Sequence, residues 1–252
     1  MSRKPFIAGN WKMNGTVAEA EERIAGLLPR VGDVDFADVA ICVPFTAIDA
    51  MVNSARGSAV EVYAQNMHQA ENGAYTGEVS APMLTELEVE GVVLGHSERR
   101  AYFGETDEAL RAKVPVALAA GLKPILCVGE TEAEREAGET ENRLRVQIQE
   151  GLADVANDQL SEVGVAYEPG WAIGTGKGAT PEQAQDALAF IRSLVADRDA
   201  EQAEQLRILY GGSMKPDNAA ELLGLPDCDG GLIGGAALDP VDFAAIVDSA
   251  KG

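Results

Sequence analysis

Residues 163–178 of the chain read VGVAYEPGWAIGTGKG, an apolar run closed by a carboxylate and followed by a loop rich in glycine. The run predicts a β-strand, and Pro169 favours an extended conformation for Glu168, which places this carboxylate at the strand's end. The glycines that follow let the backbone swing or approach a ligand, because they carry no Cβ. A carboxylate beside a loop that can close fits a general base with a lid. The alternative is an ordinary strand-to-helix turn with a solvated Glu168.

Eight short apolar runs alternate with helical patterns along the whole chain. The predicted strands lie at residues 6–8, 39–43, 60–64, 91–95, 123–128, 163–168, 207–210 and 231–233. Such alternation implies right-handed βαβ units and a parallel sheet. Eight units in 252 residues predict an α/β fold, a single-domain (β/α)8 barrel over residues 1–252, with its sites at the C-terminal strand ends. A doubly wound sheet is the rival, but no GxGxxG pattern follows the first strand and no linker divides the chain.

Start and stop signals predict where several helices begin and end. Thr16, with Glu19 three residues later, forms a capping box, and Thr46 is a second predicted cap. Residues 106–120 have a helical pattern in which Pro115 is expected to cause a kink or a break. Residues 132–156 are predicted to form mostly one long, charged helix.

The composition excludes several kinds of partner. The formal net charge of -21 argues against nucleic acid and anionic membranes, and no apolar run is long enough to cross a bilayer. No apolar segment typical of a secretory signal follows the N-terminus, which predicts a cytoplasmic protein. Cys42, Cys127 and Cys228 lie far apart, so we expect buried, reduced thiols and no metal site. An anionic substrate would need local donors to overcome the overall repulsion.

Several polar side chains come directly after predicted strands, where a barrel builds its site. Asn10 and Lys12 follow the first strand, His96 the fourth and Glu168 the sixth. Together they offer a base, an electrophile and a cation. His96 could equally be structural, and Lys12 could be one more surface lysine, although the apolar residues at positions 11 and 13 are expected to desolvate it in part.

Glycine turns follow the last two predicted strands, at residues 211–213 and 234–235. They could be tight connections only. Their position, however, matches the place where barrels bind phosphate through backbone N–H groups. For Arg99 and Arg100, beside His96, we favour an ion-paired support under the site.

Six motifs stand in order along the chain: AGNWKMN at residues 8–14, GHSERR at 95–100, YEP at 167–169, WAIGTGK at 171–177, YGGS at 210–213 and GGA at 234–236. In this order, and at strand ends, they resemble the triosephosphate isomerase family over essentially the whole chain. The resemblance implies a TIM barrel. It also implies reversible isomerisation of dihydroxyacetone phosphate and D-glyceraldehyde 3-phosphate through an enediolate, in glycolysis and gluconeogenesis. The substrate would be a small sugar phosphate, and no metal or organic cofactor would be needed.

The resemblance also assigns roles to residues that match the motifs. Glu168 would remove the proton α to the carbonyl, and His96 would polarise that carbonyl as a neutral imidazole, an assignment taken from the family and not from spacing. Lys12 and Asn10 would hold the substrate and the developing oxyanion. Backbone N–H groups would hold the phosphate near Gly174, Ser213, Gly234 and Gly235. Closure of residues 169–178 would exclude water from the enediolate, with Tyr210 and Ser213 receiving the closed loop.

This chain departs from the family's pattern in the lid. The family usually has a bulkier apolar residue where Gly170 stands, and often threonine or a similar residue at Gly178. The added glycines are expected to raise the entropy cost of closure by about 1 kcal/mol each. We therefore expect a functional enzyme whose lid closes less favourably.

The long polar loop at residues 65–79 resembles the family's dimer loop. The resemblance implies a homodimer in which Thr76 approaches the partner's Lys12. A free surface loop is the alternative. Two other functions stay open: isomerisation of a related four-carbon sugar phosphate on the same scaffold, and a binding scaffold without catalysis, against which intact Lys12, His96 and Glu168 argue. The sequence leaves open the turnover rate, assembly beyond a dimer and whether the acidic surface reflects adaptation to salt.

Overall fold

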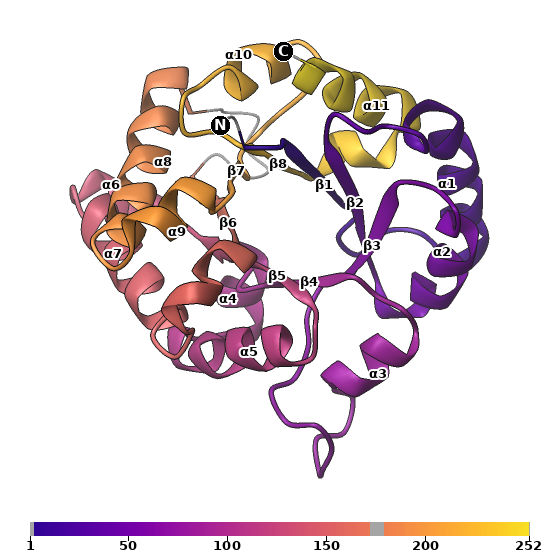
Figure 1. The fold of residues 1–252 in the computed structure, drawn as a ribbon, viewed down its shortest axis with the longest axis horizontal. Coiled ribbons are helices and arrows are strands. Elements are labelled where there is room, and N and C mark those ends of the chain that lie inside the picture. Colours follow the sequence, from indigo (N-terminus) through magenta and orange to yellow (C-terminus); the bar gives the residue numbers. More distant parts are fainter. Residues whose placement is uncertain (1–2, 172–178, 252) are drawn as a thin grey trace.

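Eight parallel strands close into a barrel in the computed structural model of the chain, which describes residues 3–171 and 179–251 (Figure 1). The order around the barrel follows the sequence, and β1 pairs with β8 to complete the ring. The strands are β1 (Phe6–Asn10), β2 (Asp38–Val43), β3 (Val60–Ala64), β4 (Gly91–Leu94), β5 (Lys123–Val128), β6 (Gly164–Tyr167), β7 (Ile208–Tyr210) and β8 (Gly230–Ile233). The predicted fold class is confirmed, and every predicted strand is present within two residues of its expected bounds.

Helices form an outer ring around the barrel (Figure 1). The α-helices are α1 (Val17–Val31), α2 (Ile48–Ala55), α3 (Ala81–Glu86), α4 (Ser97–Phe103), α5 (Asp107–Ala119), α6 (Glu132–Glu136), α7 (Thr140–Gly151), α8 (Pro181–Ala196), α9 (Ala200–Gln205), α10 (Ala219–Leu223) and α11 (Pro240–Asp248). The capping box of Thr16 and Glu19 is confirmed at the start of α1. No helix of the described residues is both long enough and apolar enough to span a membrane.

Two details of the predicted helices are wrong, and a third is narrowed. Residues 132–156 form two helices, α6 and α7, because Gly138 adopts a left-handed conformation (φ +74°) that ends the first. Thr46 lies inside a short 3-10 helix, η1 (Phe45–Ala47), and is not a cap for α2. Of the kink or break expected at Pro115, the break does not occur, because Pro115 lies inside a continuous α5.

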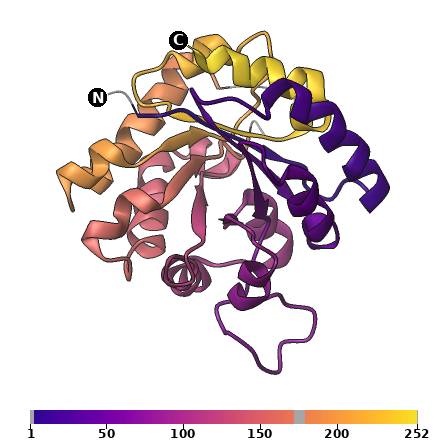
Figure 2. The ribbon, with the colours of Figure 1, turned by 45° about the vertical axis from the view of Figure 1, so that its right-hand side comes forward.

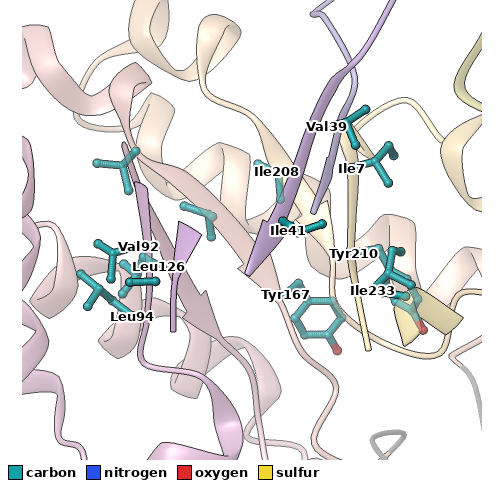
Figure 3. Packing of buried hydrophobic residues seen from close by; sticks show 14 of the residues in the cluster. Ile7, Val39, Ile41, Val92, Leu94, Leu126, Tyr167, Ile208, Tyr210 and Ile233 are labelled. Atoms are coloured by element: carbon teal, nitrogen blue, oxygen red, sulfur yellow. The ribbon is translucent and has the colours of Figure 1, made fainter. Parts of the chain in front are cut away.

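Alternate residues of each strand face the barrel interior and the helices. Phe6, Ala8, Cys42 and Cys127 belong to a buried cluster inside the barrel, whereas Ile7 packs outward with the larger cluster under the helices. Figure 3 shows part of this outer layer. All three cysteines are buried free thiols, as predicted.

The loop between β3 and α3 extends away from the body of the barrel (Figures 1 and 2). His68 and Tyr75 stack within it, with ring centroids 4.0 Å apart. Tyr75 is 51% exposed. The loop therefore projects an aromatic side chain into solvent in the single chain.

Candidate active site

The C-terminal ends of the strands surround a cavity of about 470 Å³. Its wall contains Asn10, Lys12, His96 and Glu168, which lie at or just beyond the ends of β1, β4 and β6. The same wall includes the predicted phosphate-binding residues Ser213, Gly234 and Gly235. The structure thus brings together the predicted site residues that it describes. Gly174, Gly178 and most of the predicted lid fall outside the described residues.

Glu168 is held at both ends in this cavity. Its backbone N–H donates to the carbonyl of Val128 on β5 at 2.7 Å. One carboxylate oxygen accepts from the Ser97 N–H at 2.8 Å, and the other lies 2.9 Å from Nε2 of His96. Only 2% of the residue is exposed. Burial raises the pKa of Glu168. The charge and hydrogen bond of His96, together with the Ser97 N–H, lower this pKa by more than burial raises it, so the pKa lies below the usual range.

His96 is the N-cap residue of α4, and its ring is fixed by both nitrogens. Nδ1 accepts from the Glu98 N–H at 3.2 Å, which leaves the proton of a neutral imidazole on Nε2, facing Glu168. Burial lowers the pKa of His96, but the adjacent Glu168 carboxylate raises it by more, so it lies above the ordinary value. The charge state of this imidazole therefore depends on whether the Glu168 carboxylate stays in contact with it.

Lys12 occupies a left-handed backbone conformation, with φ +53°. Its N–H donates to Asn10 Oδ1 at 3.0 Å, and its ammonium lies 2.6 Å from Glu98 Oε1. The Lys12 side chain is 28% exposed, so the lysine is partly desolvated, as expected. The expected contribution of Met13 is wrong, because Met13 is 94% exposed. The lysine is thus paired inside the protein.

Gln65, directly after β3, is a site residue that sequence reasoning missed. Its side-chain amide donates to Asn10 Oδ1 at 3.2 Å, to the Lys12 carbonyl at 2.9 Å and to the Cys42 carbonyl at 2.9 Å. These bonds fix the turn that carries Asn10 and Lys12. Its position immediately after a strand is the signal that could have found it.

The end of the cavity at which phosphate binding is predicted presents backbone N–H groups. Within the described chain, neither the N–H of Ser213 nor that of Gly235 has a hydrogen-bond acceptor. Gly235 begins the short 3-10 helix η3 (Gly235–Leu238), and the methylene stem of Lys12 lies beside Gly234. Unpaired N–H groups next to a cation form an anion-binding site.

Arg99 and Arg100 lie under the site as ion-paired supports, which confirms that prediction. Arg99 contacts Glu105 at 3.2 Å, and Arg100 contacts Asp107 at 2.5 Å while donating to the carbonyl of Gly95 at 2.8 Å. The second arginine therefore holds the backbone just before His96.

On the lid side, the buried carboxylate of Glu130 collects several donors that the sequence did not reveal. Trp171 Nε1 and the Tyr167 hydroxyl each lie 3.1 Å from its Oε1. Arg135 also contacts Glu130, at 3.1 Å, and stacks on Trp171 with 4.4 Å to the ring centroid. Trp171 is thus tied to the loop after β5. In the described chain, no group of three or more His, Cys, Asp or Glu side chains is placed to hold a metal ion.

A (β/α)8 barrel with a buried carboxylate against an imidazole, in a cavity that also presents backbone N–H groups, fits the class of enzymes that move protons on small phosphorylated substrates. A family model described as triosephosphate isomerase matches residues 5–250. A triosephosphate isomerase of Moorella thermoacetica is 53% identical over 246 residues, covering 98% of each chain. One of Solibacter usitatus is 51% identical over 247 residues (98% of this chain, 99% of the relative). One of Rubrobacter xylanophilus is 49% identical over 255 residues (99% and 98%).

The chain belongs to the triosephosphate isomerase family. It is accordingly an isomerase that interconverts dihydroxyacetone phosphate and D-glyceraldehyde 3-phosphate.

Proposed function

We propose that Glu168 is the base of this isomerisation, and that His96, Lys12 and Asn10 stabilise the charge that develops on the substrate. The observation that carries the proposal is a carboxylate only 2% exposed that nevertheless lines the cavity and contacts an imidazole. Substrate would displace the Ser97 N–H and His96 from Glu168, freeing its oxygens to take a proton from carbon. Loss of these partners in a buried setting makes the carboxylate a stronger base.

The same exchange sets the role of His96. Once Glu168 turns to the substrate, the contribution that raises the pKa of His96 is lost, and burial favours the neutral ring. The Glu98 N–H already keeps the proton on Nε2, so the imidazole donates from that atom to the substrate oxygen. Lys12 contributes positive charge beside the enediolate and the phosphate, which locally opposes the repulsion expected from a chain with a net charge of -21.

The phosphate would lie on the N–H groups of Ser213 and Gly235, beside Gly234. Gly174 belongs to the same proposed set, from the sequence resemblance alone. Since the proton is acidified by the adjacent carbonyl, no metal or organic cofactor takes part, and we expect turnover to be unchanged by a chelator.

A coupled assay on D-glyceraldehyde 3-phosphate, with Glu168→Asp alongside, tests the base. Moving the carboxylate back by one methylene misplaces it by about 1 Å, so we expect a loss of about 100-fold in kcat. Unchanged kcat in the variant would mean that another group removes the proton. Unchanged affinity for inorganic phosphate would show that the anion site is intact.

We further propose a cytoplasmic homodimer, formed through the loop at residues 65–79. Large apolar side chains are exposed around that loop and the rim of the barrel: Met13 94%, Tyr75 51%, Met83 51%, Tyr102 79% and Phe103 71%. Tyr75 and Met83 line one hollow beside this loop, and large apolar side chains that lie together on a surface are expected to be covered by a partner. Sedimentation equilibrium at micromolar concentration tests this; a fully active monomer would contradict it.

A further inference from the structure

We propose that Gln147 on α7 is a positioning residue for Glu168, acting through the backbone of Gly129. The inference rests on the proposed role of Glu168 as the base and extends the site to a helix of the outer ring. Gln147 does not contact the substrate in this proposal. It fixes the strand exit against which the base is built.

Gln147 grips one residue with both ends of its amide. Its Oε1 accepts from the Gly129 N–H at 2.7 Å, and its Nε2 donates to the Gly129 carbonyl at 3.1 Å. The residue is 1% exposed, so these bonds form away from water. Within the described chain, both hydrogen bonds of this side chain go to Gly129, which fixes that peptide in position and rotation.

Gly129 in turn lies directly against the backbone of Glu168. A Cβ added at Gly129 would be 1.8 Å from the Glu168 carbonyl oxygen and 2.7 Å from its carbonyl carbon. The approach is possible only for glycine, and no side chain lies between the two backbones to absorb a shift. A displacement of Gly129 is therefore passed to Glu168.

Bonds on either side of this contact make the coupling rigid. The Glu168 N–H donates to the Val128 carbonyl at 2.7 Å, and the Gly170 N–H donates to the Glu130 carbonyl at 3.0 Å. Residues 128–130 thus support residues 168–170 at three consecutive points. Because Gln147 holds the middle of this support, its loss is expected to move the carboxylate relative to the substrate.

Gln147→Met, which keeps the length of the side chain and removes both hydrogen bonds, is the direct test. We expect kcat to fall about 10- to 100-fold, since small misplacements of a base cost that much. The KM and the affinity for inorganic phosphate are expected to stay unchanged, because the phosphate end lies on β7 and β8. Leu144→Ala, fully buried on the same helix, is the matched control for lost stability and is expected to keep kcat.

Gln147→Glu supplies a readout that a packing role would not produce. A protonated carboxyl can both accept from the Gly129 N–H and donate to its carbonyl, whereas a carboxylate can only accept. The kcat of this variant, taken relative to the parent at each pH, should therefore be rescued at low pH and lost at high pH. Gln147→Met should show no such trend.

The proposal is overturned if Gln147→Met keeps the parental kcat, or if Leu144→Ala loses as much activity at equal thermal stability. It is also overturned if Gln147→Glu follows the parent at every pH. Glu168→Asp separates this proposal from the proposed function. If Glu168→Asp keeps full activity, the proposal that Glu168 is the base is refuted. If Glu168→Asp is inactive and Gln147→Met is unaffected, only the positioning role of Gln147 is refuted.

Discussion

At one end of the cavity, Glu168, His96 and Lys12 each contact another side chain of the protein, whereas at the other end the N–H groups of Ser213 and Gly235 have no acceptor in the described chain. In the proposed mechanism, the end with Glu168 and His96 has to exchange these internal partners for substrate. The other end has only to receive the phosphate that is proposed to bind there. Substitution of a side chain should therefore reduce activity greatly at the first end and little at the second.

The largest effect is expected from His96→Gln. The variant keeps an amide donor but loses the imidazole, whose two nitrogens aim its N–H at Glu168, so kcat should fall about 100- to 10,000-fold. Steady-state kinetics measures this. A loss confined to KM would place His96 in ground-state binding and weaken the distinction between the two ends.

The same variant should also move the acid limb of kcat/KM. In the parent, burial raises the pKa of Glu168 and His96 lowers it by more, so the base stays ionised below the usual pKa of a glutamate, and its stabilisation of the fold is lost only as pH falls through that lowered pKa. Without His96 the effect of burial gains weight, and the acid limb should shift to higher pH. A pH–rate profile of both proteins decides; a limb at the same pH would contradict the coupling.

Lys12→Met should come next, because the cation serves both ends. We expect a loss of about 100- to 1,000-fold in kcat/KM, the range for removal of one group that stabilises an oxyanion. If the lysine acts at contact distance, the loss in kcat/KM should be the same at low and at high ionic strength. Repeating the assay of both proteins in salt is the control. A loss that salt abolishes would point to long-range attraction only.

Gly170→Val tests the backbone contact on the lid side. A Cβ at this position would be 2.7 Å from the Glu130 carbonyl oxygen, so the variant must push the Gly170–Glu130 hydrogen bond apart. We expect a loss of about 1–3 kcal/mol in the free energy of unfolding, the cost of overpacking. Denaturant unfolding measures it. The sequence-based expectation was a lid that closes more readily with valine; a stabilised variant with faster turnover would favour that view.

The smallest effect is expected from Gly235→Ala. A Cβ there would meet nothing within 4 Å, and the N–H proposed to bind phosphate is retained. Both KM and kcat should stay within about twofold of the parent. A large rise in KM would show that this end of the cavity requires the absence of a side chain at position 235 as well as the backbone N–H.

The part of the site that lies at strand ends was predictable because parallel strands end on one rim. Asn10, His96 and Glu168 each follow an apolar run, and the barrel places them around one cavity. Gln65 obeys the same rule but was overlooked inside a loop assigned to dimer formation. The alternation of strands and helices was enough for the fold, since each short run is buried on both faces.

The supports behind the site were not predictable. Gln147 lies on a charged helix, and nothing in its local pattern marks an amide that reaches Gly129. Glu130 reads as one acid among many in the acidic stretch near residues 130–141, although it is 1% exposed and accepts from Trp171. Both depend on contacts between residues distant in sequence. The break at Gly138 was missed because glycine in a charged run can also be tolerated inside a helix.

The left-handed backbone of Lys12 has a consequence for attempts to make this protein resist heat. A non-glycine residue in that conformation costs on the order of 1 kcal/mol, and glycine would avoid the cost. A library screened only for survival at high temperature should therefore enrich Lys12→Gly. The survivors would be more stable proteins that have lost the cation proposed to stabilise the reacting substrate, so such a screen has to select for turnover at the same time.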